Sequence, residues 1–134
     1  MISSRLHERV NEFCKAVSRL AEACAEPETS FMRDSVIQRF EFCWELAWKM
    51  LKARLFELGV ETTNPRDCFR AAVTAQILAD GNAWTELQRM RNLTSHTYHE
   101  ALAVDVYTHL RDEGGLTCFQ ELAALSPSWL GSAT

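Results

Sequence analysis

The sequence predicts an all-α protein, an antiparallel, up-and-down helical bundle of four to five helices. Apolar residues recur every three or four positions, capping residues mark the ends of these segments, and no stretch shows the two-residue alternation of a strand. No repeat or low-complexity tract is present. We therefore expect one domain over residues 1–125 and a C-terminal tail over residues 126–134.

Two long helices are expected first, over residues 6–24 and 31–58. The first carries one apolar stripe, formed by Leu6, Val10, Phe13, Val17, Leu20 and Cys24. The second ends at Gly59, a residue type that favours the position just after a helix. Trp44 and Trp48 widen its apolar surface, as is typical of a helix between neighbours or in a subunit contact.

The second half of the chain predicts shorter helices. Asn64 and Pro65 form a start signal, and the helix that follows is expected to be interrupted at residues 80–82. Helical spacing resumes from Trp84 to Met90 and again from Leu102 to Leu110, where Gly114 and Gly115 stop it. A short last helix over residues 116–125 should precede a frayed end that begins at Ser126.

Composition limits the classes of function. The net charge of −4 argues against a surface that attracts nucleic acid everywhere, although a local basic site remains compatible with eleven arginines. Five widely spaced cysteines without a CxxC pair indicate small buried side chains in a reducing cytosol. With no signal peptide and no membrane-spanning run, a cytoplasmic protein without a membrane contact is expected.

The segment "RMRNLTSHTYHE", residues 89–100, concentrates polar chemistry in twelve residues. On an unbroken helix Arg91 and His96 would lie roughly 140° apart. The intervening Asn92, Thr94 and Ser95 compete for backbone hydrogen bonds, so one helix should end near Arg91 and the next begin near Ser95. His96 would then lie in the first turn of the second helix, and its side chain could converge with that of Arg91.

Such a convergence would suit phosphodiester chemistry. The positive end of a helix disfavours a charged imidazole there and presents free N–H groups to an anion, while Arg91 adds a fixed cation. RNA supplies its own 2′-OH nucleophile, so its cleavage needs proton transfer and charge stabilisation without a metal. A polar junction between two helices explains the same residues, and from the residues alone that plainer interpretation is favoured.

Other candidate features are weaker. Glu45 and Lys49 have the spacing of a helical ion pair on a solvated or interfacial face. Trp44 and Trp48 could stack a base, but core or dimer packing is the commoner role. Acidic residues lack the clustering that a metal site needs, so neither a metal nor a cofactor is expected.

The ordered segments "DSVIQRFEFCWELAWKMLKARLFELG", "NPRDCFRAA" and "RNLTSHTYHE" resemble the small HEPN-domain proteins described as nucleotidyltransferase substrate-binding subunits. The resemblance covers residues 31–110. It implies a HEPN-like helical bundle, a two-fold homodimer whose Arg-x4-His segments meet near the axis, and a separate minimal nucleotidyltransferase as partner. In many such pairs the HEPN protein is a metal-independent endoribonuclease toxin with RNA as substrate, and the nucleotidyltransferase is the antitoxin.

Carried over to this sequence, the resemblance assigns Arg91 to the phosphate, Asn92 to a flanking polar role and His96 to acid or base catalysis. Tyr98 would be the residue that the partner modifies with AMP, because an anionic adenylate beside His96 would block the site. The sequence departs from the family at His99, where an aspartate is common, and at Gln76, where a small residue is usual. We expect His99 to be exposed and Gln76 to matter for packing.

Two alternatives to the ribonuclease remain. The chain could be a non-catalytic subunit that presents a substrate to the nucleotidyltransferase, with Arg91, His96 and Tyr98 holding a nucleotide or phosphate. It could also be a scaffold with no ligand site.

Overall fold

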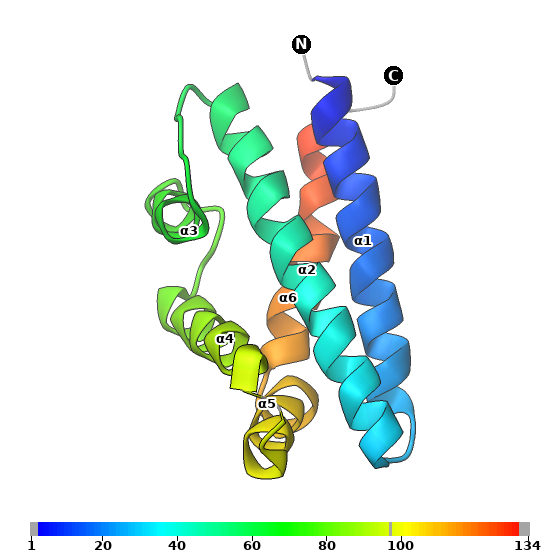
Figure 1. The fold of residues 1–134 in the computed structure, drawn as a ribbon. Helices are drawn as coiled ribbons and strands as arrows, with labels where there is room; N and C mark the ends of the chain where they lie inside the picture. The colour runs from blue at the N-terminus through cyan, green and yellow to red at the C-terminus, as the bar shows by residue number, and fades with distance from the viewer. Residues whose placement is uncertain (1–2, 97, 132–134) are drawn as a thin grey trace.

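The first two helices form a long antiparallel pair (Figure 1). The computed structural model describes residues 3–96 and 98–131. Helix α1 runs over Ser4–Ala25 and α2 over Ser30–Glu57, within two residues of the predicted limits. Each begins at an N-cap hydroxyl, Ser3 for α1 and Thr29 for α2, which accepts a hydrogen bond from the backbone N–H three residues later.

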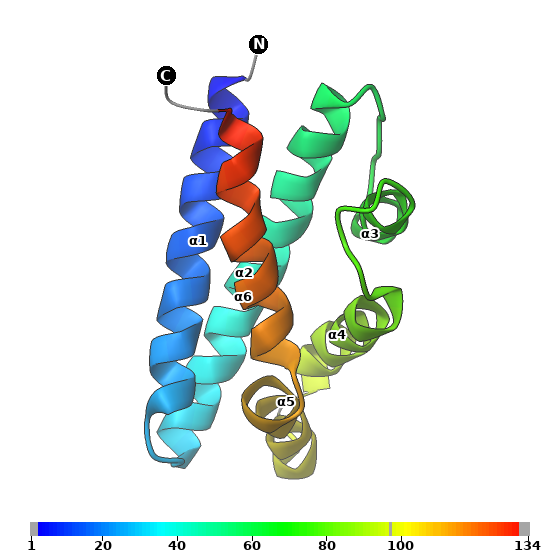
Figure 2. The ribbon, with the colours of Figure 1, turned by 180° about the vertical axis from the view of Figure 1, so that it is seen from behind.

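The C-terminal segment packs along this pair. Helix α6, Gly115–Leu125, and the 3₁₀ helix η2, Ser126–Leu130, run beside α1 (Figure 2). Ser126 is fully buried, Trp129 is 6% exposed, and the guanidinium of Arg54 lies 5.5 Å from the centroid of the Trp129 ring. The prediction of a frayed end from Ser126 is therefore wrong for the η2 residues, because burying Trp129 removes a large apolar surface from water.

Three shorter helices lie on one side of the long pair (Figure 1). Helices α3, Pro65–Thr74, and α4, Gly81–Leu93, lie beside α2 on the side away from α1. Helix α5, Glu100–Asp112, packs against α2, α4 and α6. The side chain of Asp80 caps α4 by accepting from the N–H of Ala83 at 3.0 Å, so the helix already includes Gly81, which the sequence placed in the interruption.

Gln76, just beyond the end of α3, has an unusual backbone conformation. Its φ is 62°, which makes it the one non-glycine residue of the described chain with a positive φ. The N–H of Gln76 donates to the carbonyl of Val73 at 3.0 Å, and that of Ile77 to the carbonyl of Ala72 at 2.9 Å. This is a Schellman motif, whose left-handed position favours glycine. The presence of glutamine where the family has a small residue therefore bears on the backbone conformation at residue 76, and not only on packing, as we expected.

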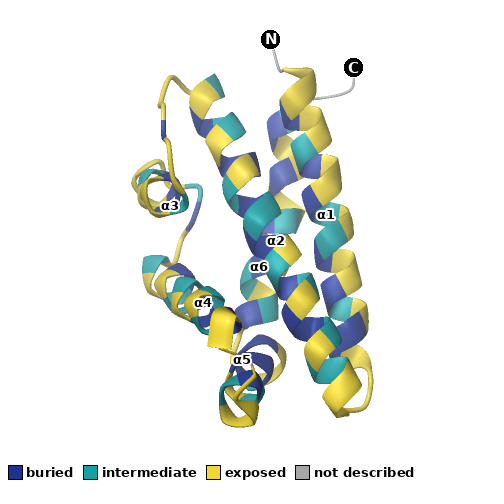
Figure 3. Ribbon diagram, viewed as in Figure 1, coloured by how far each residue is buried: buried dark blue, intermediate teal, exposed yellow. Residues whose placement is uncertain are grey.

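A group of stacked aromatic rings attaches the short helices to the long ones. Phe69 of α3 lies between Trp44 of α2 and Trp84 of α4, with ring centroids 4.5 and 5.2 Å away. Phe119 of α6 meets the Trp84 ring edge-on at 5.4 Å. Figure 3 shows the buried residues gathered on the facing surfaces of the helices. Trp44, at 3% exposure, is therefore a core residue.

The all-α helical bundle that the sequence predicts is confirmed. Among the described residues it contains six α-helices instead of four to five, together with two 3₁₀ turns and no strand. Within residues 3–96 and 98–131, no helix has the length and apolar character needed to cross a membrane.

Candidate functional site

The predicted break between the two motif-bearing helices exists, but it lies later than expected. Helix α4 ends at Leu93, the 3₁₀ turn η1 covers Thr94–His96, and α5 begins at Glu100. His96 therefore lies in the turn, and His99 takes the N-cap position of α5 without a side-chain capping bond.

The hydroxyl groups of η1 explain where the break falls. Thr94 Oγ1 donates to the carbonyl of Arg91 at 2.6 Å, and Ser95 Oγ donates to the carbonyl of Asn92 at 3.0 Å. Both hydroxyls therefore extend the end of α4, and neither caps the start of α5. Serine and threonine make this backward bond as readily as a forward cap, so residue type alone did not distinguish the two.

Arg91 is held at the C-terminal end of α4 by side chains from two elements. Its Nη1 donates to Thr94 Oγ1 at 3.0 Å. The carboxylates of Glu41 and Glu45, on α2, lie 3.8 and 3.6 Å from Nη1 and Nη2. The Nε atom is buried and has no hydrogen-bond partner within the described residues. A cation in this place is also favoured by the negative end of the helix dipole.

The remaining motif side chains are open to solvent. His96 and His99 are exposed, as expected for His99, and Tyr98 is 78% exposed. The ring centroids of His96 and Tyr98 are 6.2 Å apart, and those of Tyr98 and His99 are 4.5 Å apart. This exposure excludes a purely structural role for Tyr98 as a half-buried side chain. Among the described residues no hydrogen bond joins Arg91 to His96.

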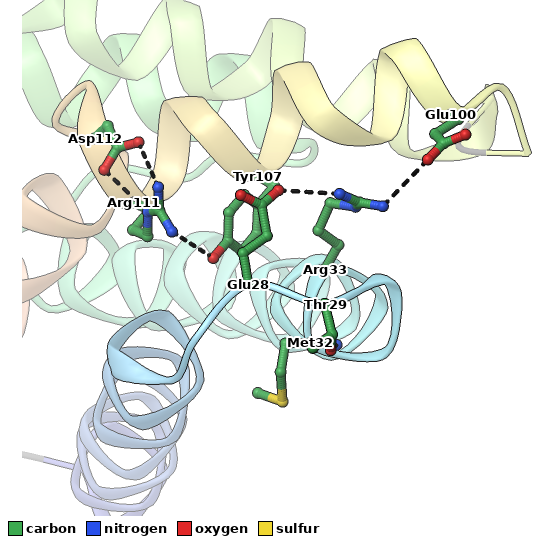
Figure 4. Close-up of polar contacts among 8 residues, drawn as sticks. All are labelled: Glu28, Thr29, Met32, Arg33, Glu100, Tyr107, Arg111 and Asp112. Carbon is green, nitrogen blue, oxygen red and sulfur yellow. Dashed lines mark hydrogen bonds and ion pairs between the residues drawn. The ribbon is translucent and has the colours of Figure 1, made fainter.

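The N-terminus of α5 already has an acidic side chain. Glu100, in its first turn, accepts a hydrogen bond from Nη2 of Arg33 at 3.3 Å, and Nη1 of the same guanidinium reaches Glu28 at 3.0 Å (Figure 4). The expectation that this helix end receives an anion rested on a start near Ser95, and it does not carry over. Arg33 instead ties the start of α5 to the start of α2.

At the other end of α5, a second arginine bonds to side chains of the same helix. Nη1 of Arg111 donates to the hydroxyl of the buried Tyr107 at 2.9 Å, while its Nε reaches Asp112 at 3.0 Å (Figure 4). Arg33 therefore joins α5 to the start of α2, whereas both partners of Arg111 belong to α5 itself. Helix α5 is in turn in contact with η1.

Asn92 follows Arg91 directly and is exposed at the rim of a cleft of about 820 Å³ between α3 and α4. Its side chain therefore faces a different neighbourhood from that of Arg91. No group of three or more His, Cys, Asp or Glu side chains among the described residues has the arrangement of a metal site.

Three residues at this site were missed as partners of Arg91. Thr94 was interpreted only as a helix breaker, and Glu45 as a partner of Lys49. In the structure Glu45 instead faces Arg91 and accepts from Nε1 of Trp48 at 3.0 Å. Helical spacing gave no signal for Glu41, because its contact with Arg91 depends on how α2 and α4 pack.

Fold and motif together define a class: an all-α bundle with an Arg-x4-His-x-Tyr segment at a helix junction. The family model described as "Nucleotidyltransferase substrate binding protein like" matches residues 8–118. The chain belongs to this HEPN-type family, as the resemblance predicted.

Two relatives illustrate the similarity. The chain is 33% identical over 94 residues to a "Probable ribonuclease HepT" of Haemophilus influenzae, a match that covers 63% of this chain and 64% of the relative. It thus spans somewhat less than two thirds of that protein. A crystal structure of a protein from Thermus thermophilus is 32% identical, with a TM-score of 0.68 over 87% of this chain and 94% of the other.

Proposed function

We propose that this protein is a metal-independent endoribonuclease that acts with a separate minimal nucleotidyltransferase. The observation that carries the proposal is the position of Arg91 and His96 at one helix junction, in a chain similar to a probable ribonuclease. Arg91 is fixed by Thr94 and two glutamates, whereas His96 is exposed and accessible to a substrate.

The proposed reaction is the attack of a ribose 2′-OH on the adjacent phosphorus. A neutral His96 removes the 2′-OH proton, the bond to the 5′-oxygen breaks, and a protonated imidazole returns a proton to that leaving oxygen. The products are a 2′,3′-cyclic phosphate and a free 5′-OH. Arg91 stabilises the extra negative charge of the phosphorane, a role for which a fixed guanidinium needs little reorganisation.

We propose further that the working site is formed by two copies of the chain. One copy offers a single His96, without a hydrogen bond to its own Arg91, so a second copy would supply the second proton carrier. The exposed face of α2 supports such a dimer, because Phe31, Phe42 and Phe56 lie on one stripe and are 83%, 57% and 66% exposed. Aromatic residues in exposed rows are typical of protein interfaces.

Tyr98 is the proposed point of control by the nucleotidyltransferase. Its phenolic oxygen would attack the α-phosphate of ATP, form the phosphodiester to AMP and release pyrophosphate. The 78% exposure of Tyr98 and the closeness of its ring to His96 support this role. An adenylate attached there would cover His96 and compete for Arg91.

The test is growth inhibition and RNA cleavage by the protein expressed alone. His96→Ala should abolish both and leave folding unchanged, while His7→Ala, an exposed histidine of α1, should retain both. Coexpression with the nucleotidyltransferase should add the mass of AMP to Tyr98 and silence the enzyme, and Tyr98→Phe should escape silencing. Undiminished cleavage by His96→Ala would refute the assignment.

The second candidate is a binding subunit that presents a nucleotide substrate to the nucleotidyltransferase. The description of the matched family favours it, as does the engagement of Arg91 by two carboxylates in a single chain. Expression without the partner separates the candidates: harmless expression and no cleavage by the wild type would favour the binding subunit.

A further inference from the structure

We propose that the cleft between α3 and α4 binds the phosphate backbone of a single-stranded RNA and leads it to the Arg91–His96 segment. The inference rests on the proposed function for the identity of the substrate. Its own support is the chemistry of the cleft, which no motif of the sequence identified.

The cleft is basic although the protein is acidic. Its volume is about 820 Å³, and three arginines line it, Arg66 and Arg70 from α3 and Arg89 from α4. No acidic side chain is among the described residues that line it. In a chain with a net charge of −4, such a cleft is a place where an RNA phosphate is attracted and meets no carboxylate in the lining.

Arg66 and Arg70 are the strongest candidates for phosphate contacts. They lie one helical turn apart on α3, and both are exposed. Within the described residues neither has an ion-pair partner, so their guanidinium groups are available to an external anion. Arg89 contributes less, because Nε and Nη2 both donate to Glu86. The four residues from Arg66 to Arg70 correspond to a rise of about 6 Å along α3, so the two guanidinium groups offer two separate contacts to a strand.

The walls and floor suit RNA in two further ways. Asn82, Thr85 and Gln88 offer amide and hydroxyl groups along α4, which can bond to ribose 2′-OH groups. Phe69 and Trp84, stacked and nearly buried, form a rigid floor. A preformed cleft of this kind binds a ligand with little loss of protein entropy.

One end of the cleft adjoins the helix junction that carries the proposed reaction site. Asn92 lines its α4 end, follows Arg91 directly, and bonds through its carbonyl to Ser95 in η1. A strand that leaves the cleft past Asn92 therefore meets the turn that carries His96.

A second cleft, of about 980 Å³, provides a matched comparison. Four cationic side chains line it, Arg5 and Arg9, also one helical turn apart, with Lys49 and Lys52, but two carboxylates, Glu57 and Glu61, line it too. Its two carboxylates offset half of this positive charge and would repel a phosphate, so it is the weaker of the two phosphate sites. Replacing either arginine pair changes the net charge of the protein equally.

The experiment measures the affinity of a fluorescein-labelled, mixed-sequence 20-nucleotide single-stranded RNA by anisotropy, in a His96→Ala background that leaves the RNA intact. Arg66→Ala/Arg70→Ala should weaken binding at least about tenfold and reduce the slope of log K against log salt by about 1.4, since each lost contact to a single strand contributes about 0.7. Arg5→Ala/Arg9→Ala should change neither the affinity nor the dependence of the affinity on salt. Circular dichroism checks that all variants fold.

The outcomes separate the cleft from the proposed nuclease. Three results would overturn the proposal that the cleft binds RNA. These are an equal loss of affinity for both arginine pairs, no loss of affinity for the Arg66 and Arg70 pair, and no RNA binding by the His96→Ala parent. If the cleft variant loses binding while the protein with His96 restored never cleaves RNA, the cleft stands and the nuclease fails. If the wild type cleaves RNA and Arg66→Ala/Arg70→Ala cleaves it equally well, the nuclease proposal stands and the cleft proposal fails.

Discussion

Two hydrogen bonds of opposite direction join Arg91 and Thr94. Nη1 of Arg91 donates to Thr94 Oγ1 at 3.0 Å, and the same hydroxyl donates to the Arg91 carbonyl at 2.6 Å. Thr94 is 8% exposed, so water competes little for either bond. The proposed catalytic guanidinium is therefore fixed by a residue that also forms the turn bearing His96.

Thr94→Val should consequently impair catalysis more than stability. It keeps the shape of the side chain but removes both bonds, which costs about 1 to 2 kcal/mol of unfolding free energy. A displaced guanidinium should lower kcat by about 10- to 100-fold with little change in KM. Thr94→Ser, which keeps the hydroxyl, should restore most of kcat. Equal kcat values for the two variants would show that Thr94 does not position Arg91.

Phe42→Asp should dissociate the proposed homodimer. Phe42 is 57% exposed and lies three residues before Glu45, so it is on the same side of α2 as the carboxylate that faces Arg91. A carboxylate placed in an apolar interface loses its hydration without a partner. Light scattering coupled to size-exclusion chromatography should show a monomer, and cleavage should disappear with the dimer.

Leu125→Asp is the matched control for the dimer experiment. Leu125 is a 41% exposed apolar residue of α6, so the substitution adds the same charge on another helix. It should leave the dimer intact. A wild-type protein that is monomeric at micromolar concentration would contradict the composite site.

Gln76→Gly should stabilise the protein. Gly59 and Gln76 occupy equivalent left-handed positions after α2 and α3, with φ values of 85° and 62°. Glycine adopts this conformation without the strain that a Cβ brings, so the substitution should add about 1 kcal/mol of unfolding free energy. Gly59→Ala should remove about the same amount. Thermal unfolding should show shifts of about 3 to 5 °C in opposite directions.

If the thermal unfolding midpoint falls in Gln76→Gly as well as in Gly59→Ala, this account of Gln76 is wrong. That result would mean that its side chain makes a contact worth more than the backbone strain it imposes. Gln88→Gly, in the interior of α4, serves as a control that should destabilise, because glycine there only adds freedom to the unfolded chain.

Stability should fall in alkaline solution through the buried thiols. Burial raises the pKa of Cys43 from its ordinary value of 9.0 to about 12, with a smaller contribution from Cys24 nearby. Between these values the unfolded chain releases a proton that the folded protein keeps, so the free energy of unfolding decreases as pH rises from about 9 towards 12.

Urea unfolding between pH 8 and 11 measures this decrease. In Cys43→Ala the dependence on pH should be shallower, although its stability near neutrality will be lower if a small cavity remains. Parallel curves for the two proteins would exclude Cys43 as the cause. The same burial should protect Cys24, Cys43 and Cys68 from alkylation, whereas the half-buried Cys14 and Cys118 should react first.

Local signals in the sequence determined the helices and most of their ends. Apolar periodicity predicted α1 and α2, and the Asn64-Pro65 signal predicted the start of α3, because each depends only on neighbouring residues. The Arg-x4-His-x-Tyr segment and the family were likewise visible in the sequence. The position of the break was not, since a hydroxyl can bond backward, as Thr94 does, or forward to cap a helix.

Tertiary structure alone decided what surrounds that segment. The approach of Glu41 and Glu45 to Arg91 depends on the packing of α2 against α4, and the basic cleft exists only because α3 folds back beside α4. Trp129 lies in a stretch that the sequence predicted to be frayed, and it is buried because η2 packs against α1 and α6. Periodicity specifies which face of a helix is apolar, but the partner of each polar side chain follows from the packing of helices distant in the sequence.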